Sequence, residues 1–146
     1  MGSVVKSSVE KWTGKEGEEL VLLGRDFNAR TGTGGRRCVG EEGEVRIRRS
    51  KDEKINGEGR KLIEFVEENG WKIFNGCIRG DEEGKYSFTG GRGNTVIDYV
   101  IGDLEVRDRI GRMRIGDKID SDHHPVKVWI EDSGGRKLER RKGRRD

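Results

Sequence analysis

The sequence has little of the material from which a large hydrophobic core is built. Hydrophobic residues make up 29% of its 146 residues, whereas 40% are charged; a typical soluble domain carries about 25% charged residues. A domain of this length normally buries roughly two-thirds of the surface of its unfolded chain, which this composition makes difficult. The sequence therefore predicts either a loose domain rich in loops or one part of a larger domain.

Cysteine is also scarce, and long apolar stretches are lacking. Cys38 and Cys77 form no C-x-x-C pair and have no histidine at ligand spacing, so a zinc site is not expected. Two thiols suffice for one disulfide, but nothing indicates a secreted chain. Residues 1–10 hold no apolar signal-peptide core, and no run approaches the roughly 18 apolar residues of a membrane span. We expect a soluble intracellular protein without membrane contact, in the nucleus or the cytoplasm.

Positive charge is concentrated near the end of the sequence. Residues 132–146 hold seven Lys and Arg against three Asp and Glu, a net charge of +4, which leaves −1 for residues 1–131 because the total is +3. Clustered like charges are typical of solvated, disordered tails, and also of segments that bind nucleic acid. We predict a disordered basic tail and keep both roles open.

Apolar patterning predicts one strong helix and several strands. The helix spans residues 57–69, where apolar residues recur at helical spacing and Asn69-Gly70 supplies a stop. Strands are expected at 19–24, 71–74, 85–89, 95–101 and 124–130. The third and fourth are joined by a glycine-rich turn and are expected to form a hairpin. The first does not alternate, which indicates burial on both faces. A short helix is expected in the polar segment 1–19, and the charged segment 30–56 is expected to be a long, solvated loop.

Polar residues stand at the carboxyl end of the first predicted strand. Asp26 and Asn28 lie two residues apart, so their side chains point the same way if the strand geometry continues. A carboxylate there can activate a water molecule, and an amide can orient that water or a phosphate oxygen. An Asp-x-Asn at a strand end also forms turns and helix caps, so the pair by itself leaves both interpretations open.

A further acid lies inside the most hydrophobic segment. Asp98 stands between two apolar neighbours, where a carboxylate is costly unless it is paired or hydrogen-bonded. It either binds backbone amides, or faces solvent at a sheet edge, or orients a histidine and stabilises its imidazolium form. Both histidines of the chain follow in Asp122-His123-His124-Pro125. Neighbouring side chains oppose each other on an extended strand, so we expect one of the two histidines to face a site.

This inventory indicates a class of chemistry. It offers several carboxylates, one amide and one histidine, and no serine or cysteine placed as an evident nucleophile. Carboxylates hold Mg²⁺, the metal offsets phosphate charge, and a cationic imidazole stabilises a developing negative oxygen. Such a set suits metal-assisted hydrolysis of a phosphate ester.

Three stretches, taken in order, resemble a known superfamily. Gly24-Arg25-Asp26-Phe27-Asn28-Ala29-Arg30 resembles the G-G-D-F-N-A-R signature of the endonuclease/exonuclease/phosphatase superfamily. Ile97-Asp98-Tyr99 resembles its I/L-D-Y strand, and Ser121-Asp122-His123-His124-Pro125 resembles its S-D-H-x-P motif. The segment Tyr86-Ser87-Phe88-Thr89 looks like the LINE-type retrotransposon endonuclease branch, and within it the chain is similar to the insect craniofacial development protein 2-like group. The similarity covers about residues 20–130.

The resemblance implies a fold and an activity. The fold is the C-terminal half of a layered α/β sandwich, two mixed sheets flanked by helices, with residues 20–131 as a partial domain. The activity is phosphodiester cleavage with Mg²⁺ or Mn²⁺. The retrotransposon branch favours DNA as the substrate, while RNA and small phosphorylated molecules remain open.

The resemblance also implies residue roles. Asp26 would position or activate the attacking water and bind the metal, and Asn28 would orient that water and the scissile phosphate. Asp98 would hold the catalytic His123. Asp122 would lie at or near the metal, or assist protonation of the leaving oxygen, and Arg30 would contact the substrate.

The sequence departs from the family pattern at two points. Arg25 occupies the position of the second glycine, and the metal-binding glutamate of the family's N-terminal half is not found, since Glu10, Glu18 and Glu19 lack its motif context. His124 falls on a variable position of the motif, so no role carries over to it. We therefore expect weak or no activity by itself, with a missing N-terminal half needed for a complete site. The alternative is a non-catalytic remnant that binds nucleic acid through its basic tail.

Overall fold

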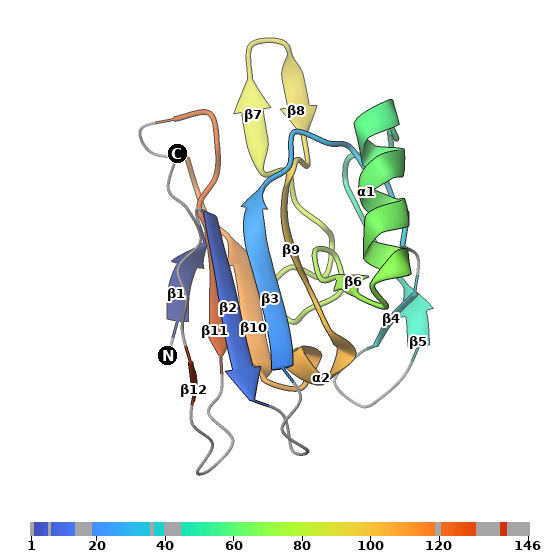
Figure 1. The fold of residues 1–146 in the computed structure, drawn as a ribbon. Helices are drawn as coiled ribbons and strands as arrows, with labels where there is room; N and C mark the ends of the chain where they lie inside the picture. Colours follow the sequence, from blue (N-terminus) through green and yellow to red (C-terminus); the bar gives the residue numbers. More distant parts are fainter. Residues whose placement is uncertain are drawn as a thin grey trace.

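The computed structural model describes residues 2–5, 7–13, 19–35, 37–39, 45–118, 121–130 and 138–139. Over these ranges the chain is a mixed α/β fold with several small sheets and few helices (Figure 1). Every strand pairing in the described ranges is antiparallel. The mixed sheets expected from the resemblance are therefore not what these strands form.

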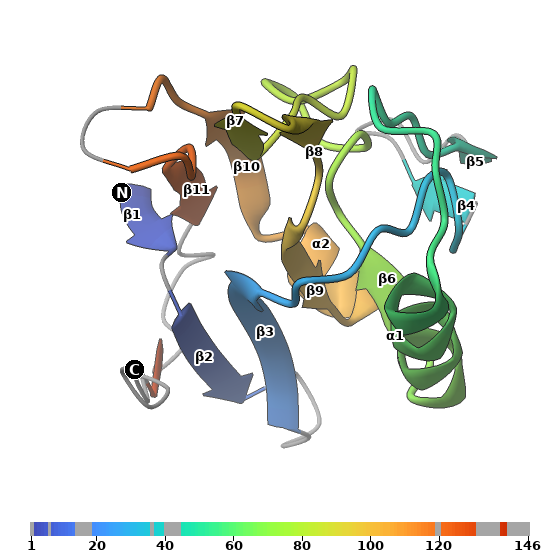
Figure 2. The ribbon, with the colours of Figure 1, turned by 90° about the horizontal axis from the view of Figure 1, so that it is seen from above.

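In these described ranges, the named strands form two larger sheets and two hairpins. The five-stranded sheet has the order β12 (Leu138–Glu139), β2 (Ser7–Thr13), β3 (Glu19–Asp26), β9 (Asp98–Gly102) and β6 (Lys72–Ile73). The three-stranded sheet has the order β1 (Gly2–Val5), β11 (Val126–Ile130) and β10 (Ile110–Ile115). The hairpins are β4 (Arg37–Val39) with β5 (Val45–Ile47), and β7 (Phe88–Gly90) with β8 (Gly93–Thr95). Seen from above, the two larger sheets form separate layers, and α1 lies beyond the five-stranded one (Figure 2).

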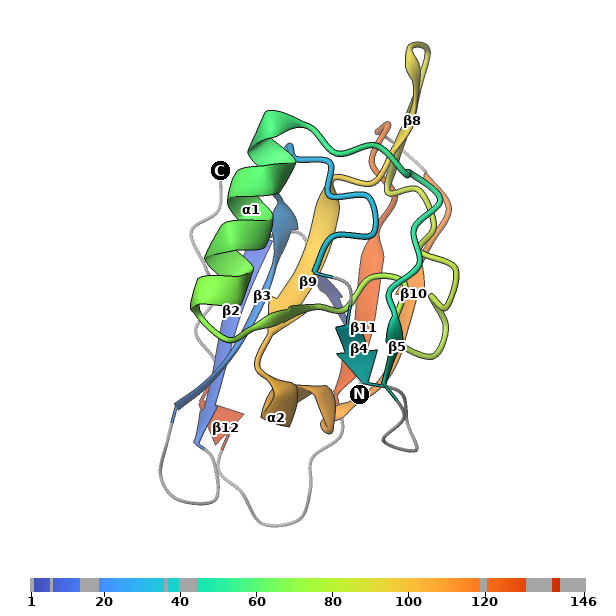
Figure 3. The same ribbon diagram turned by 90° about the vertical axis from the view of Figure 1, so that its right-hand side faces the viewer.

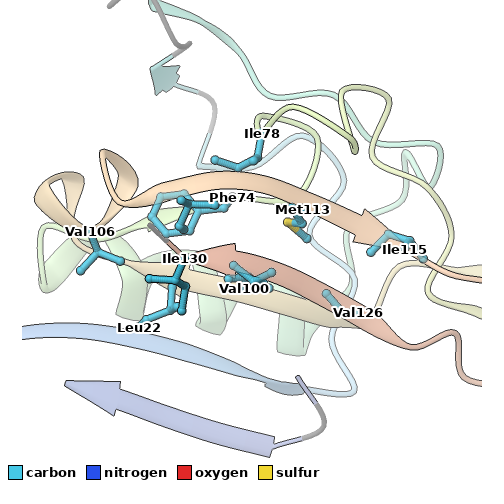
Figure 4. Packing of buried hydrophobic residues seen from close by; sticks show 11 residues of the cluster. Leu22, Phe74, Ile78, Val100, Val106, Met113, Ile115, Val126 and Ile130 are labelled. Atoms are coloured by element: carbon cyan, nitrogen blue, oxygen red, sulfur yellow. The ribbon is translucent and has the colours of Figure 1, made fainter. Parts of the chain in front are cut away.

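Strand β9 is buried on both faces because its side chains contribute alternately to two apolar clusters. Val100 joins a cluster that takes Leu22 from β3 and further side chains from β10 and β11 (Figure 4). Tyr99 and Ile101 join the second cluster, which includes residues of α1 (Gly57–Glu68). Figure 3 shows α1 beside β3 and β9, on the side away from β10 and β11. The short chain thus concentrates its few apolar residues around one central strand.

The predicted helix at 57–69 is confirmed as α1, and its ends follow from local chemistry. Asn56 caps the N-terminus because its Oδ1 accepts a hydrogen bond of 2.8 Å from Gly59 N, one of the donors that a helix leaves unpaired. The same oxygen accepts from Arg30 N at 3.0 Å. Asn69 is the C-terminal cap, and Gly70 follows with a φ of +68°, which glycine adopts readily. The N-cap residue Asn56 therefore joins the start of α1 to Arg30, in the segment that follows β3.

The helix predicted within residues 1–19 is wrong, because this segment forms β1 and β2. Strand β2 pairs with β3 from Ser7↔Arg25 to Thr13↔Glu19. The buried strand β3 needs partners for its backbone N–H and C=O groups. Pairing with β3 therefore determines the structure of residues 7–13, although their apolar residues recur at helical spacing. The predicted disordered tail at 132–146 lies outside the described residues, apart from β12.

The remaining strands follow the sequence pattern, but their bounds differ from the predicted ones. The run at 19–24 is confirmed as β3, and the pattern at 124–130 gives β11 with Val126, Val128 and Ile130 buried. The hairpin is present as β7 and β8, but the predicted strand 95–101 divides into β8 and β9. It divides because Val96 N donates to Asp52 Oδ2 and Ile97 N donates to Ser87 Oγ. At these two residues, side-chain oxygens accept the backbone hydrogen bonds that a neighbouring strand would otherwise accept.

The charged segment 30–56 is solvated only in part: residues 49, 51 and 53–56 are exposed, as its composition predicts. It contains β4 and β5, and Arg48 within it is 0% exposed. Burial lowers the pKa of Arg48, and its guanidinium donates to Gly34 O, Asn75 O, Thr31 Oγ1 and Gly32 O. A buried, fully hydrogen-bonded side chain of this kind fixes the conformation of the loop around it. No helix among the described residues is long and apolar enough to cross a membrane.

Candidate catalytic site

Two carboxylates meet where β3 ends and β9 begins. Asp26 is the last residue of β3, Asp98 is the first of β9, and the two stand directly opposite each other in the register. The β7–β8 hairpin rises beyond this end of the sheet (Figure 1). Antiparallel pairing therefore brings together two acids that lie more than 70 residues apart in the chain.

His123 completes what we call the Asp26–His123–Asp98 group. Its Nδ1 lies 2.9 Å from Asp98 Oδ2 and its Nε2 lies 3.7 Å from Asp26 Oδ2. Because a carboxylate only accepts hydrogen bonds, Nδ1 carries a proton and donates it to Asp98. The imidazole ring stands edge-on against Phe88, with ring centroids 5.1 Å apart. The prediction that Asp98 orients His123 agrees with this geometry.

Buried polar residues hold Asp98 in place. Ser87 Oγ accepts hydrogen bonds from Ile97 N at 2.9 Å and Asp98 N at 3.0 Å. Asn75 donates through Nδ2 to Asp98 O and accepts at Oδ1 from Val100 N, both at 2.9 Å. Ser87 and Asn75 are fully buried. Sequence reasoning named Ser87 only as part of the Tyr86–Thr89 motif and gave neither residue a role, since a small polar residue beside an apolar segment gives no signal of its partner.

The predicted pairing of Asp26 with Asn28 takes a different form. Strand β3 ends at Asp26, and Asn28 adopts a φ of +47°, so the strand geometry assumed for the two side chains does not continue. Instead, Asn28 N donates to Asp26 Oδ1 at 2.7 Å, which is the turn interpretation. This bond fixes one oxygen of Asp26 and leaves Oδ2 directed toward His123.

His124 and Arg30 have structural partners in this fold. His124 Nδ1 donates to Gly116 O at 2.6 Å, and Nε2 lies 3.0 Å from Thr89 Oγ1, so this ring does not face the Asp26–His123–Asp98 group. Arg30 Nε and Nη2 donate to the two oxygens of Asp52 at 2.9 and 2.7 Å. Contact of Arg30 with a substrate stays a prediction, and in this structure its guanidinium forms an ion pair with Asp52.

Opposing effects set the pKa values of the group. Burial lowers the pKa of His123, but the hydrogen bond and charge of Asp98, together with the charges of Asp26 and Asp122, raise it above the ordinary 6.5. Burial raises the pKa of Asp98, and the hydrogen bond and charge of His123 oppose this rise. The imidazolium form of His123 is thus favoured, and it in turn favours an ionised Asp98.

The first testable prediction is therefore that His123 titrates above pH 6.5. Because its pKa is raised by folding, the charged pair stabilises the fold fully below the unfolded pKa, and the contribution is lost as the pH rises through the folded pKa. Imidazole proton shifts in NMR measure this value, and His123→Ala assigns the signal. Asp98→Asn is expected to lower the pKa of His123; an unchanged value in that variant would contradict the pairing.

The geometry admits a divalent ion only weakly. Ligand atoms of Asp26, Asp98 and His123 lie within 4.8 Å of one another, but Asp98 Oδ2 serves His123 and Asp26 Oδ1 serves Asn28 N. Mg²⁺ is commonly held by one or two carboxylates together with water and substrate phosphate. Asp26 Oδ2, on a side chain that is 43% exposed, fits such a ligand.

Asp122 stands apart from these ligand atoms. Its side chain is 58% exposed, and Oδ1 lies 3.7 Å from Lys118 Nζ. Its backbone oxygen accepts from Thr89 N at 2.9 Å. Its charge still contributes to the raised pKa of His123, so Asp122 lies near enough to act on that ring electrostatically. Its predicted role as a metal ligand stays a prediction.

Comparison with known proteins leaves the site to be judged on its own geometry. No protein-family model matches the chain, and no curated protein matches it.

Proposed function

We propose that the chain is a slow, metal-assisted phosphodiester hydrolase of the endonuclease/exonuclease/phosphatase type. The observation that supports it best is the line of contacts from Asp98 through His123 to Asp26. A histidine oriented by a buried carboxylate, with its second nitrogen facing another carboxylate, has the elements of general acid–base chemistry. The resemblance in three ordered motifs supports the same class.

Each residue of the group has a distinct task in this proposal. Asp98 holds the ring of His123 and favours its imidazolium form, whose Nε2–H can donate to a phosphate oxygen as negative charge develops. Asp26 can accept a proton from a water molecule through Oδ2, or hold the metal ion through that oxygen. Mg²⁺ or Mn²⁺, when bound, supplies positive charge that offsets the phosphate. Asp26 Oδ2, which lies 3.7 Å from His123 Nε2, is the single carboxylate oxygen of the group offered to the metal ion, so we expect weak metal binding and a low rate.

The finer aspects of the fold and substrate belong to the same proposal. We infer a layered α/β sandwich, supported by the apolar cluster that joins β3 and β9 with β10 and β11. We also infer a LINE-type retrotransposon origin and DNA as the favoured substrate. The alternative function, nucleic-acid binding by a non-catalytic remnant, depends on residues 132–146, of which the structure describes only β12. Deleting residues 134–146 and measuring DNA affinity separates the two, because catalysis at the site does not need that tail.

The second testable prediction concerns Asp26. Asp26→Asn is expected to abolish nicking of supercoiled plasmid by the protein with Mg²⁺ or Mn²⁺, because it removes the carboxylate that would hold the metal ion or accept the proton of the attacking water. The matched control is Asp108→Asn, which neutralises an exposed acid after α2 (Leu104–Arg107), and which should nick at the wild-type rate. Nicking that survives Asp26→Asn would disprove the site assignment, and its absence in the wild-type protein with either metal would disprove the hydrolase.

A further inference from the structure

Arg25 precedes Asp26 on β3 and presents an exposed cation one residue from the Asp26–His123–Asp98 group, on the opposite face of the strand. Its Cζ lies over the ring of Phe27, 5.3 Å from the centroid. Its Nε donates weakly to Asp26 O at 3.4 Å. The stacked ring restricts a long side chain that would otherwise lose much conformational freedom when it binds a ligand. The guanidinium is therefore partly oriented before any partner arrives.

The charges around the site make such a cation significant. Asp26, Asp98 and Asp122 place three carboxylates around one imidazole, and this arrangement repels a phosphate unless nearby cations offset it. Two other cations near this end are already paired, Lys118 with Asp122 and Arg30 with Asp52. Within the described part of the chain, Arg25 has no carboxylate in an ion pair. Among the described residues, the guanidinium is engaged by the weak bond from Nε to Asp26 O and by the stacking on Phe27.

We propose that Arg25 binds a backbone phosphate of nucleic acid next to the phosphate held at the Asp26–His123–Asp98 group. Neighbouring side chains of a strand project to opposite faces, so Arg25 and Asp26 do not share one phosphate. A nucleic-acid backbone that crosses the end of β3 could place one phosphate at Asp26 and a neighbouring phosphate at Arg25. This inference rests on the proposed function, because it takes the Asp26 side of the strand as the reacting side.

Arginine suits this task better than lysine. Its planar guanidinium presents several N–H donors in a fork that matches two phosphate oxygens, and it stacks on aromatic rings. Phe27 supplies that ring, and Phe27 is itself tilted against Tyr99 with ring centroids 6.2 Å apart. The contact carries no base-reading atoms, so we expect it to add affinity for nucleic acid without sequence preference.

The test is DNA binding by the full chain, measured by fluorescence anisotropy with a short labelled duplex and EDTA present. Arg25→Gln is expected to weaken binding and to reduce the slope of log affinity against log salt by about 0.9, the value for one phosphate contact, between about 50 and 200 mM salt. Arg25→Lys should keep most of the salt slope and lose part of the affinity. This is the third testable prediction.

The matched control is Arg112→Gln. Arg112 is also exposed and stacks over an aromatic ring, with its Cζ 4.8 Å from the centroid of Trp129, but it lies on β10, away from the candidate site. Its loss should leave the slope close to the wild-type value. Far-ultraviolet circular dichroism and urea midpoints confirm that each variant is folded.

Every outcome of this experiment bears on the inference. An unchanged slope in Arg25→Gln, an equal reduction in Arg112→Gln, or no binding by the wild-type chain would overturn it. Asp26-dependent nicking together with an unchanged slope would reject the phosphate contact and keep the hydrolase. A reduced slope without any nicking would keep the phosphate contact and reject the hydrolase.

Discussion

Asp98→Asn is expected to reduce metal-dependent nicking by about 10²-fold or more, within the range for lost acid–base catalysis. The asparagine fits the same space but no longer favours the imidazolium form of His123, and its amide can face the ring with an N–H instead of an oxygen. The carboxylate that orients the ring is 14% exposed, so water screens its effect only partly. Initial rates on supercoiled plasmid at fixed metal concentration measure the loss.

The same substitution is expected not to destabilise the fold. Burial raises the pKa of Asp98, so its ionised form is costly in the folded protein at neutral pH. The neutral asparagine removes this cost, which offsets the lost attraction to the imidazolium of His123. We expect the free energy of unfolding in urea to change by less than about 1 kcal/mol. Lost activity with retained stability identifies a residue that acts on His123; a fall of several kcal/mol would show that Asp98 maintains the fold instead.

Arg48→Met is expected to lower the free energy of unfolding by about 3–5 kcal/mol. The guanidinium donates to four oxygens in the 31–34 turn and at Asn75, and methionine would leave those acceptors buried and unpaired. Net stabilities of small domains are only about 5–15 kcal/mol. The variant should therefore unfold at much lower urea concentration.

The adjacent arginine provides the control for this prediction. Arg49 is exposed, so Arg49→Met removes the same charge and should change stability by about 0.5 kcal/mol or less. Equal urea midpoints for the two variants would contradict the structural role assigned to Arg48. Because Arg48 Nη2 donates to Thr31 Oγ1, which is bonded to the Tyr99 hydroxyl, its loss should also slow nicking by loosening β9.

Burial and charge within apolar runs made part of this structure predictable. Strand β3 lacks alternation, and Leu22 and Leu23 contact different apolar clusters, as a strand buried on both faces requires. An acid inside the run that forms β9 needed a partner, and His123 provides it. This pairing was predictable because a buried carboxylate is costly unless it has a partner, and few residues in the chain can act as that partner.

Other features depend on contacts between distant segments and carry no local signal. Ser87, Asn75 and Arg48 resemble ordinary surface residues in sequence, and only the folded chain brings their donors and acceptors to buried partners. Strand β2 forms because β3 needs a neighbour, although its own apolar spacing suits a helix. Local apolar patterns show which face of a segment is exposed to solvent. These elements instead depend on hydrogen-bonding groups in distant segments that would otherwise be unpaired.

The central claim is that Asp98 and His123 act as one unit, and a double-mutant cycle of nicking rates tests it most directly. Wild-type protein, Asp98→Asn, His123→Ala and the double variant are assayed on the same plasmid with Mg²⁺ or Mn²⁺. Since residues of one unit give non-additive losses, we predict that the double variant nicks no more slowly than His123→Ala alone. Losses that multiply in the double variant, or single variants that nick as fast as the wild-type protein, would contradict the account.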